Sequence, residues 1–153
     1  SYVEQPLQGW DLEGLAWIRK ATGVPIMVDE SVWNAHDVIK VAEAKAADII
    51  NIKLTKAGGL KNSLDMYTTA DALGLPCVIG TELEGCVGVA AKLQLAASLE
   101  NLPFACEFTE LAFQKMAVKE HLTLEDGYLR VPRGAGLGMS PDKDLIEEHK
   151  TSL

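Results

Sequence analysis

Five short apolar segments recur along the chain, and their ends lie about 25 residues apart, with segments of helical periodicity between them. The apolar segments span residues 2–4, 25–29, 49–53, 77–80 and 104–108. A regular alternation of strand and helix predicts βαβ units, in which crossover helices join parallel strands. The strands are almost continuously apolar, which is typical of a sheet that is buried on both faces.

Helix start and stop signals lie between these strands. A first helix is expected from the cap Asp11 to Gly23, and a second over about 35–46 after the cap Asn34. Two more are expected over about 60–73 and 87–99, and residues 54–59 are expected as a polar connection. After residue 108 the pattern fades. It predicts a short helix over 111–118, a hairpin over 122–131 turning at Asp126-Gly127, a glycine-rich loop over 132–138, and a charged tail helix over 142–150.

Two α/β architectures fit this order: an open doubly wound sheet and a TIM-like (β/α) barrel. The regular period favours the barrel, although five units are too few to close eight strands. Residues 1–110 are therefore expected to form a partial barrel, and residues 111–153 a carboxyl-terminal segment. Residues 2–4 look like the end of a strand already under way and no methionine precedes them, so we expect a fragment that lacks its amino-terminal part.

Composition excludes several classes of protein. Apolar residues make up 48% and charged residues 24% of the 153 residues, as in a soluble globular protein. The formal net charge of −8 argues against nucleic acid as a partner. No apolar run approaches the roughly 20 residues that span a membrane. Cys77, Cys86 and Cys106 lie in apolar surroundings without metal-ligand spacing, which predicts reduced thiols in the cytoplasm.

Charged residues occupy the carboxyl ends of the predicted strands. Glu4, Asp29, Lys53 and Glu107 each end an apolar segment, and in a barrel such ends converge on one mouth. Gathered carboxylates repel one another unless a cation neutralises them, and hard oxygen ligands suit Mg²⁺, with Mn²⁺ also possible. Glu30 should point away from Asp29 and act only as support in a second layer.

Lys53 has two interpretations. An ammonium beside a divalent cation loses its proton more readily, because like charges disfavour the protonated form, and the lysine can then act as a general base. The metal would stabilise an enolate formed from a carboxylate substrate. Alternatively, Lys53 forms only an ion pair with the acids. Asn51 shares a strand face with Lys53 and is a further candidate for the site.

Three motifs in order carry a resemblance to a known family. The segments YVEQP, VDES and NIKLTKAGG place Glu4, Asp29 and Lys53 at intervals of 25 and 24 residues, and VPRGAGLGM follows near the end. Together they resemble the enolase superfamily, in its muconate-lactonizing-enzyme (muconate cycloisomerase) subgroup. The resemblance covers nearly the whole chain, from the fourth barrel strand to the tail.

The resemblance implies roles for individual residues. Glu4 and Asp29 match metal ligands, Lys53 matches the acid/base lysine, and Lys56 falls where members often carry an auxiliary lysine. Glu107 matches a carboxylate that contacts the substrate and is counted with the catalytic residues. Glu82 and Glu84 lie in a segment that resembles a loop lining the substrate site.

The implied function is a Mg²⁺-dependent isomerase, such as a cycloisomerase, racemase or epimerase, that moves a proton α to a carboxylate through an enolate. The alternatives are a catalytically incomplete fragment, a dehydratase of the same superfamily, and an unrelated acidic interaction module. In the family, a first metal-binding acid comes from the third strand and a partner lysine from the second strand, and neither strand is expected in this sequence. The capping domain that closes the site is also expected to be missing, and residues 111–153 would pack on it. The edge of the strand at residues 2–4 is expected to be unpaired, which predicts a homo-oligomer.

Overall fold

A computed structural model of the chain describes residues 1–108, 117–120 and 122–150. The chain divides into two compact units. The first comprises Ser1–Gly80 and Glu100–Glu107, and the second comprises the described residues of Thr81–Leu99 and Phe108–Leu153. The domain boundary expected at residue 110 stays a prediction; in the division into compact units, the helix over residues 86–98 groups with the carboxyl-terminal segment.

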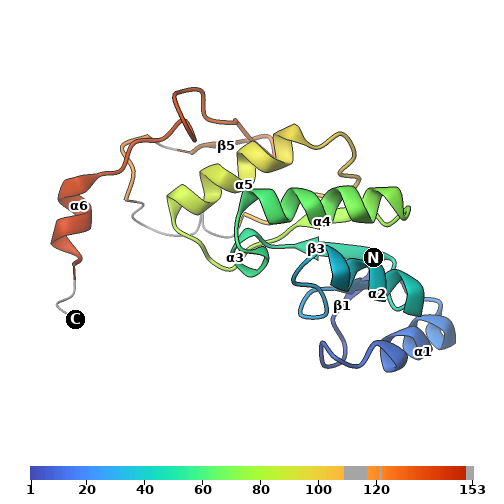
Figure 1. Cartoon of the computed structure of the whole chain (residues 1–153). Helices are drawn as coiled ribbons and strands as arrows, with labels where there is room; N and C mark the ends of the chain where they lie inside the picture. The colour runs from blue at the N-terminus through green and yellow to red at the C-terminus, as the bar shows by residue number, and fades with distance from the viewer. Residues whose placement is uncertain (109–116, 121, 151–153) are drawn as a thin grey trace. The chain divides into compact units, whose positions relative to one another are not determined.

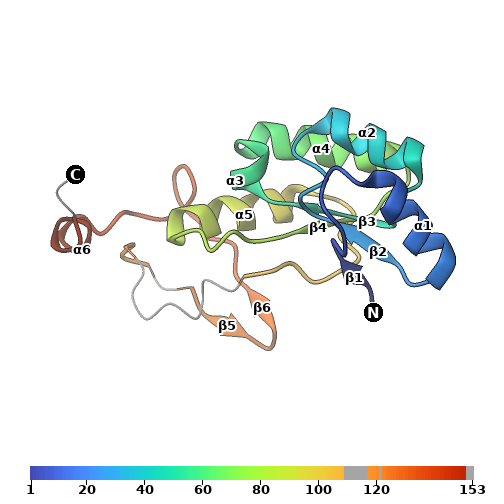
Figure 2. The same cartoon turned by 90° about the horizontal axis from the view of Figure 1, so that it is seen from below.

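The first unit is built on a parallel sheet of four strands in the order β1-β2-β3-β4; Figure 1 labels β1 and β3, and Figure 2 labels all four strands. The strands are β1 Val3–Glu4, β2 Ile26–Val28, β3 Ile49–Ile52 and β4 Cys77–Ile79. Neighbours in sequence are neighbours in the sheet, as expected for consecutive βα units. Every residue of β2, β3 and β4 is buried, whereas both residues of β1, at one edge, are exposed.

Helices cross between these strands at the predicted places. They are α1 Leu12–Thr22, α2 Ala35–Ala44 and α4 Leu60–Ala72, and α2 and α4 pack against each other beside the sheet (Figure 2). The Asp11 carboxylate accepts a hydrogen bond from the backbone N–H of Gly14, and Gly23 ends α1 in the left-handed conformation. Asn34 caps α2 by accepting from the backbone N–H groups of His36 and Asp37. The central residues of all four predicted helices are therefore confirmed as helical. The fourth of these helices is α5 Cys86–Ser98, which belongs to the second unit.

Two predictions in this unit are wrong. Residues 104–108 do not form a strand, although the Glu107 backbone N–H donates to the Ile79 carbonyl of β4 at 3.0 Å. Pro103 just before this segment removes a donor that a strand would use. Residues 54–59 are not a simple connection, because Leu54–Ala57 forms a short helix, α3, which ends at Gly58 in the left-handed conformation.

The second unit contains α5, a two-stranded antiparallel hairpin and a tail helix. The hairpin is β5 Leu124–Glu125 and β6 Tyr128–Leu129, and the tail helix is α6 Lys143–Glu148. Asp126 and Gly127 both have positive φ, as the predicted two-residue turn requires. The short helix expected over 111–118 lies mostly outside the described residues, and Val118 forms an isolated bridge with Pro141.

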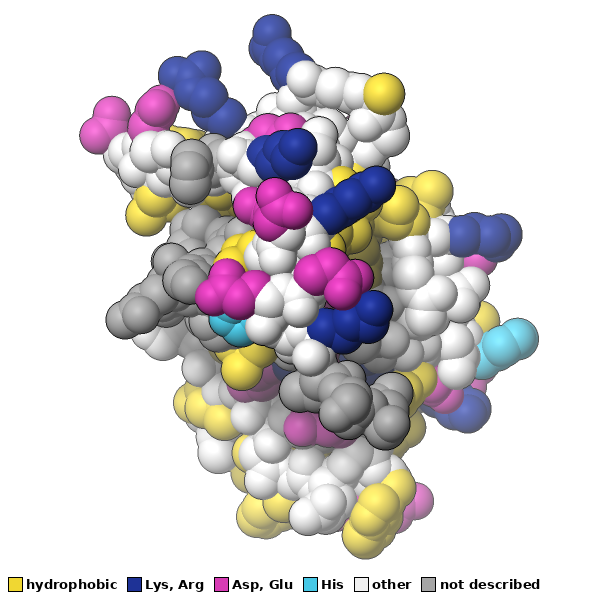
Figure 3. Space-filling model, turned by 90° about the vertical axis from the view of Figure 1, so that its left-hand side faces the viewer, with side chains coloured by type: hydrophobic (Ala, Val, Ile, Leu, Met, Phe, Trp, Pro, Cys, Tyr) yellow, Lys and Arg dark blue, Asp and Glu magenta, His cyan; other side chains and the backbone are white. Residues whose placement is uncertain are grey.

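The remaining surface features agree with the composition. No helix in the described part of the chain is long and apolar enough to cross a membrane. Acidic and basic side chains are interspersed on the face drawn in Figure 3.

Candidate active site at the carboxyl ends of the strands

Asp29 lies at the centre of a cluster of charged side chains in the first unit. It directly follows β2, and its carboxylate receives two ammonium groups. Lys53 Nζ lies 2.6 Å from Asp29 Oδ2, and Lys56 Nζ lies 2.6 Å from Asp29 Oδ1. Lys53 directly follows β3, so adjacent parallel strands bring the acid and the first lysine together at one edge of the sheet. The spacing of the motifs therefore predicted a real juxtaposition.

Lys56 reaches the same acid from α3. Its side chain is only 3% exposed, and Nζ also donates to the backbone carbonyls of Asp29 and, at 3.4 Å, Asn51. The helical turn of α3 is what allows two lysines three residues apart to address opposite oxygens of one carboxylate. Because this turn was expected to be an irregular connection, the position of Lys56 could not be foreseen from the residues alone.

Burial and pairing oppose each other in setting the protonation of these groups. Burial raises the pKa of Asp29, but the hydrogen bonds and charges of Lys53 and Lys56 outweigh this effect, so its pKa lies below the ordinary value. For Lys56 burial dominates and lowers the pKa, although the pairing with Asp29 opposes it. Asp29 is therefore an ionised carboxylate at neutral pH, as a metal ligand must be.

Asn51 connects the third strand to Glu4 on the first. Asn51 is fully buried, and its Nδ2 donates to Glu4 Oε1 at 2.8 Å, across the intervening strand β2. Its Oδ1 is buried and has no hydrogen-bond partner among the described atoms. A Cβ added to Gly80 would lie 2.1 Å from this oxygen, so glycine at the end of β4 makes the space for the Asn51 side chain. Glu4 itself is exposed.

Gln5 supports the cluster and was not predicted. Its Oε1 accepts from the backbone N–H of Asp29 at 2.7 Å and of Ser31 at 3.3 Å, and its Nε2 donates to Ser31 Oγ at 2.9 Å. Gln5 has φ of 36°, an unusual value for a residue other than glycine. This backbone turn aims the amide at the loop after β2. Residue type gave no signal for it, because glutamine at a strand end is ordinarily a surface residue.

The remaining candidates each lie within one of the two compact units. Glu30 is exposed, and its backbone carbonyl accepts from the indole N–H of Trp33. Glu107 is half-buried at the end of the segment beside β4. Glu82 and Glu84 belong to the second unit, where Glu84 Oε2 accepts from Thr81 Oγ1 at 3.0 Å and from the backbone N–H of Glu82 at 3.1 Å.

The donor set is chemically suited to a divalent cation. Glu4 and Asp29 offer hard carboxylate oxygens at the ends of neighbouring strands, the type of ligand that Mg²⁺ prefers. Within residues 1–108, 117–120 and 122–150, no three Asp, Glu, His or Cys side chains gather closely enough to form a complete metal site.

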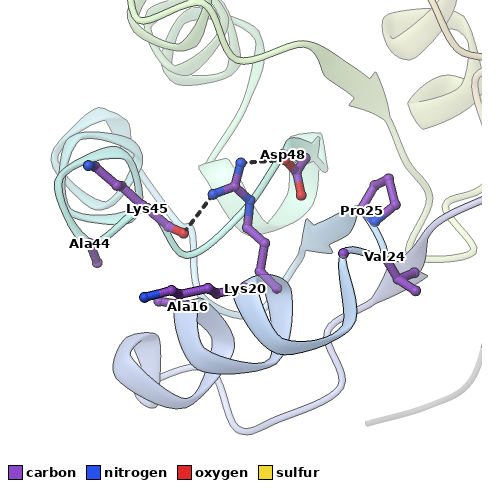
Figure 4. Close-up of a pocket in the computed structure, with 9 residues that line it drawn as sticks. Ala16, Lys20, Val24, Pro25, Ala44, Lys45 and Asp48 are labelled. Carbon is purple, nitrogen blue, oxygen red and sulfur yellow. Dashed lines mark hydrogen bonds and ion pairs between the residues drawn. The ribbon is translucent and has the colours of Figure 1, made fainter.

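A separate pocket lies at the opposite, amino ends of β2 and β3. It has a volume of about 500 Å³ and is lined by residues of α1, α2 and the loops that follow them (Figure 4). The Arg19 guanidinium donates to Asp48 Oδ1 at 2.6 Å and to the Lys45 carbonyl at 3.3 Å. Asp48 Oδ2 also accepts from the backbone N–H of Ile26 at 3.0 Å. These contacts fasten α1 to the beginnings of two strands, and none of the predicted site residues lines this pocket.

A parallel sheet of βα units with acids and lysines at its carboxyl edge defines a segment of a (β/α) barrel domain. The sequence model described as "Enolase C-terminal domain-like" matches residues 1–145, and the chain belongs to this family. This confirms the predicted family and the partial barrel.

Individual relatives agree with that membership. Muconate cycloisomerase 1 of Rhodococcus opacus is 38% identical over 146 residues, which are 95% of this chain and 39% of that protein. The crystal structure of 2-chloromuconate cycloisomerase from Rhodococcus opacus 1CP superposes with a TM-score of 0.95 and 31% identity over 99% of this chain and 42% of that one. A dipeptide epimerase from Cytophaga hutchinsonii, in complex with Mg and the dipeptide D-Ala-L-Val, gives a TM-score of 0.89 and 30% identity over 97% of this chain and 40% of that one. The chain thus spans about two fifths of the length of these relatives.

Proposed function

We propose that this chain carries the acid/base half of an isomerase site that moves a proton on the carbon next to a carboxylate. The observation that carries the proposal is the Asp29 carboxylate, whose two oxygens are held by Lys53 and Lys56 at the carboxyl edge of a parallel sheet. Relatives named as muconate cycloisomerases and as a dipeptide epimerase support an isomerase in particular.

Lys53 is the residue that transfers the proton. The side chain of Lys53 is 14% exposed, so a substrate can reach it. The side chain of Lys56 is only 3% exposed and is almost fully enclosed. In its neutral form Lys53 removes the α proton of the substrate, and as an ammonium it returns one. Lys56 holds Asp29 in place, and its charge helps to keep Asp29 ionised.

Glu4 and Asp29 would hold Mg²⁺. A relative whose structure contains Mg supports this choice, as does the oxygen character of both ligands. The ion, when bound, supplies positive charge that lowers the cost of removing a proton beside a carboxylate. Asn51 holds Glu4 in place through its hydrogen bond. Glu30 supports the two metal ligands from a second layer of residues. Glu107 approaches the substrate from the segment beside β4.

The substrate class is a small carboxylate, and the choice between a muconate and a dipeptide is testable directly. The longest natural form of the protein is incubated with Mg²⁺ and a panel of muconates and dipeptides, and turnover is followed by proton NMR. Turnover of either class that is lost with EDTA and restored by Mg²⁺ supports the proposal. Metal-independent turnover, or Mg²⁺-dependent loss of water from a hydroxy acid instead, contradicts it.

This chain by itself is a second candidate: a catalytically incomplete piece. Among the described residues no three Asp, Glu, His or Cys side chains gather into a metal site, whereas Mg²⁺ requires several ligands, which favours that reading for the isolated 153 residues. The assay is therefore repeated on the isolated chain. We also expect the exposed edge of β1 to promote self-association, which light scattering measures. A cytoplasmic location remains a prediction from the thiols.

A further inference from the structure

A lysine lies completely buried in the middle of the second unit. Lys92 is 0% exposed, on a helix, α5, whose other buried residues are apolar, among them Val89, Ala90 and Leu93. Removing an ammonium from water carries a large free-energy cost unless charge and hydrogen bonds replace the water. An alanine-rich helix that needed only to pack would not carry a lysine at this position. Lys92 therefore calls for a role beyond packing.

Two of the partners of Lys92 are Glu84, in the loop of residues 81–85, and an aromatic ring. Lys92 Nζ lies 3.1 Å from Glu84 Oε2 and 5.1 Å from the centroid of the Phe108 ring. The same Glu84 oxygen accepts from Thr81 Oγ1 at 3.0 Å and from the backbone N–H of Glu82 at 3.1 Å. One carboxylate oxygen thus collects donors from the helix and from two positions of the loop.

The loop that this carboxylate organises is strained. Leu83 has φ of 60°, a left-handed conformation that costs a leucine free energy, and its side chain is 61% exposed. The backbone N–H of Leu83 donates to Thr81 Oγ1 at 3.1 Å, so the hydroxyl that binds Glu84 also holds the strained residue. Close approach to α5 requires glycine at 88, because a Cβ there would lie 2.4 Å from Glu84 Cβ. Contacts that hold the loop must offset the free-energy cost of the left-handed conformation of Leu83.

We propose that Lys92 is a positioning residue that fixes the loop of residues 81–85 through Glu84. The loop begins two residues after the carboxyl end of β4. If the proposed function is correct, it contributes to substrate binding, and that part of the inference rests on the proposed function. A methionine could fill the space of Lys92, but only a cation there supplies a charge-assisted contact to the Glu84 carboxylate, which in turn holds Thr81 and Glu82.

The test separates positioning from packing by a double replacement. Lys92→Met with Glu84→Leu removes both charges, so neither is left buried without a partner, and such replacements often retain stability. Hydrogen–deuterium exchange at the amides of Glu82 and Leu83 is measured beside the urea midpoint. We expect a midpoint close to that of the parent protein and exchange at both amides faster by about tenfold or more, as loss of charge-assisted hydrogen bonds predicts.

Two further variants keep the test decisive. Lys92→Arg retains the cation and is expected to retain the slow exchange, whether or not the double variant folds. Gln94→Leu is the matched control on the same helix, because Gln94 Nε2 donates to the carbonyls of Pro132 and Leu137 instead. It should leave the amides of Glu82 and Leu83 unchanged. Parent-like exchange in a folded double variant, or rapid exchange in a folded Lys92→Arg, overturns the proposal.

Steady-state kinetics then test whether the loop of residues 81–85 contributes to substrate binding. In the longest natural form of the protein, the double variant is expected to raise KM at least about fivefold with a smaller change in kcat, because a displaced loop weakens binding more than proton transfer. An unchanged KM with accelerated exchange would overturn the link to the substrate. Failure of the proposed function would instead show as absent isomerase activity in the parent protein, and the exchange measurement does not depend on that.

Discussion

Lys56 donates a hydrogen bond to the carboxylate of Asp29 and another to the backbone carbonyl of the same residue. This double contact fixes both the side chain and the peptide that follows β2. Lys53 addresses the other carboxylate oxygen at 2.6 Å. The two lysines are thus unequal: one is enclosed and holds the acid, while the other remains partly open to solvent.

Lys56→Met should destabilise the protein by about 2–3 kcal/mol, because it removes one partner of a buried ion pair while Lys53 still compensates part of the charge. Urea unfolding measures the change. The matched control is Lys61→Met, since Lys61 pairs with Asp65 on the surface of α4 and should contribute little. Equal effects of the two substitutions would show that enclosure of Lys56 has no energetic consequence.

Gly80→Ala should disturb the site without touching a charged residue. The added Cβ would meet Asn51 Oδ1 at 2.1 Å, so the Asn51 side chain must move and its hydrogen bond to Glu4 is lost. We expect a loss of about 1–3 kcal/mol in stability from overpacking and weaker Mg²⁺ binding by calorimetry. Gly85→Ala is the control, because nothing lies within 4 Å of a Cβ at that position. Intact Mg²⁺ binding in Gly80→Ala would argue against Asn51 as the support of Glu4.

Asp48→Asn should flatten the acid limb of the stability profile. The hydrogen bond from Arg19 is the main reason that the pKa of Asp48 lies below its ordinary value. A carboxyl with a lowered folded-state pKa stabilises the protein above its unfolded pKa of about 4, and that stabilisation disappears as the pH falls through the folded value. The difference in urea midpoint between the parent and Asp48→Asn should therefore shrink on going from pH 6 towards pH 2. A constant difference would contradict the pairing with Arg19.

Cys77 should resist thiol reagents in the folded protein. Burial raises its pKa to about 12, so almost no thiolate is present at pH 8. Iodoacetamide labelling followed by peptide mass spectrometry should leave Cys77 unmodified in buffer and modify it in urea. Rapid labelling of Cys77 in the native protein would show that β4 opens readily.

Much of this architecture could be predicted because local and tertiary signals agree. The positions of Asp11, Gly23 and Asn34 set helix ends that the structure confirms, and the apolar runs gave four of the five expected strands. Parallel strands end at one edge of a sheet, so Asp29 and Lys53 could be placed together from their spacing alone.

Other features depend on geometry that residue types do not encode. The reach of Lys56 depends on the turn α3, and the contact of Gln5 with Asp29 depends on a positive φ. Glu82 and Glu84 were grouped by sequence with the substrate loop, yet Glu84 is held by Lys92 eight residues later. A lysine within an alanine-rich helix was the available signal for that pair, and helical periodicity alone does not select its partner.

In the proposed function, Lys53 transfers the α proton of a carboxylate substrate. The most direct measurement is solvent deuterium exchange at that carbon, followed by NMR in D₂O with Mg²⁺, in the longest natural form of the protein and in its Lys53→Ala variant. Calorimetry with Mg²⁺ alone provides the control. We expect exchange to fall by at least about a thousandfold in Lys53→Ala while Mg²⁺ affinity is unchanged or higher, because an ammonium that competes for Asp29 has been removed. Exchange at the parent rate in Lys53→Ala, with Mg²⁺ bound, would contradict it.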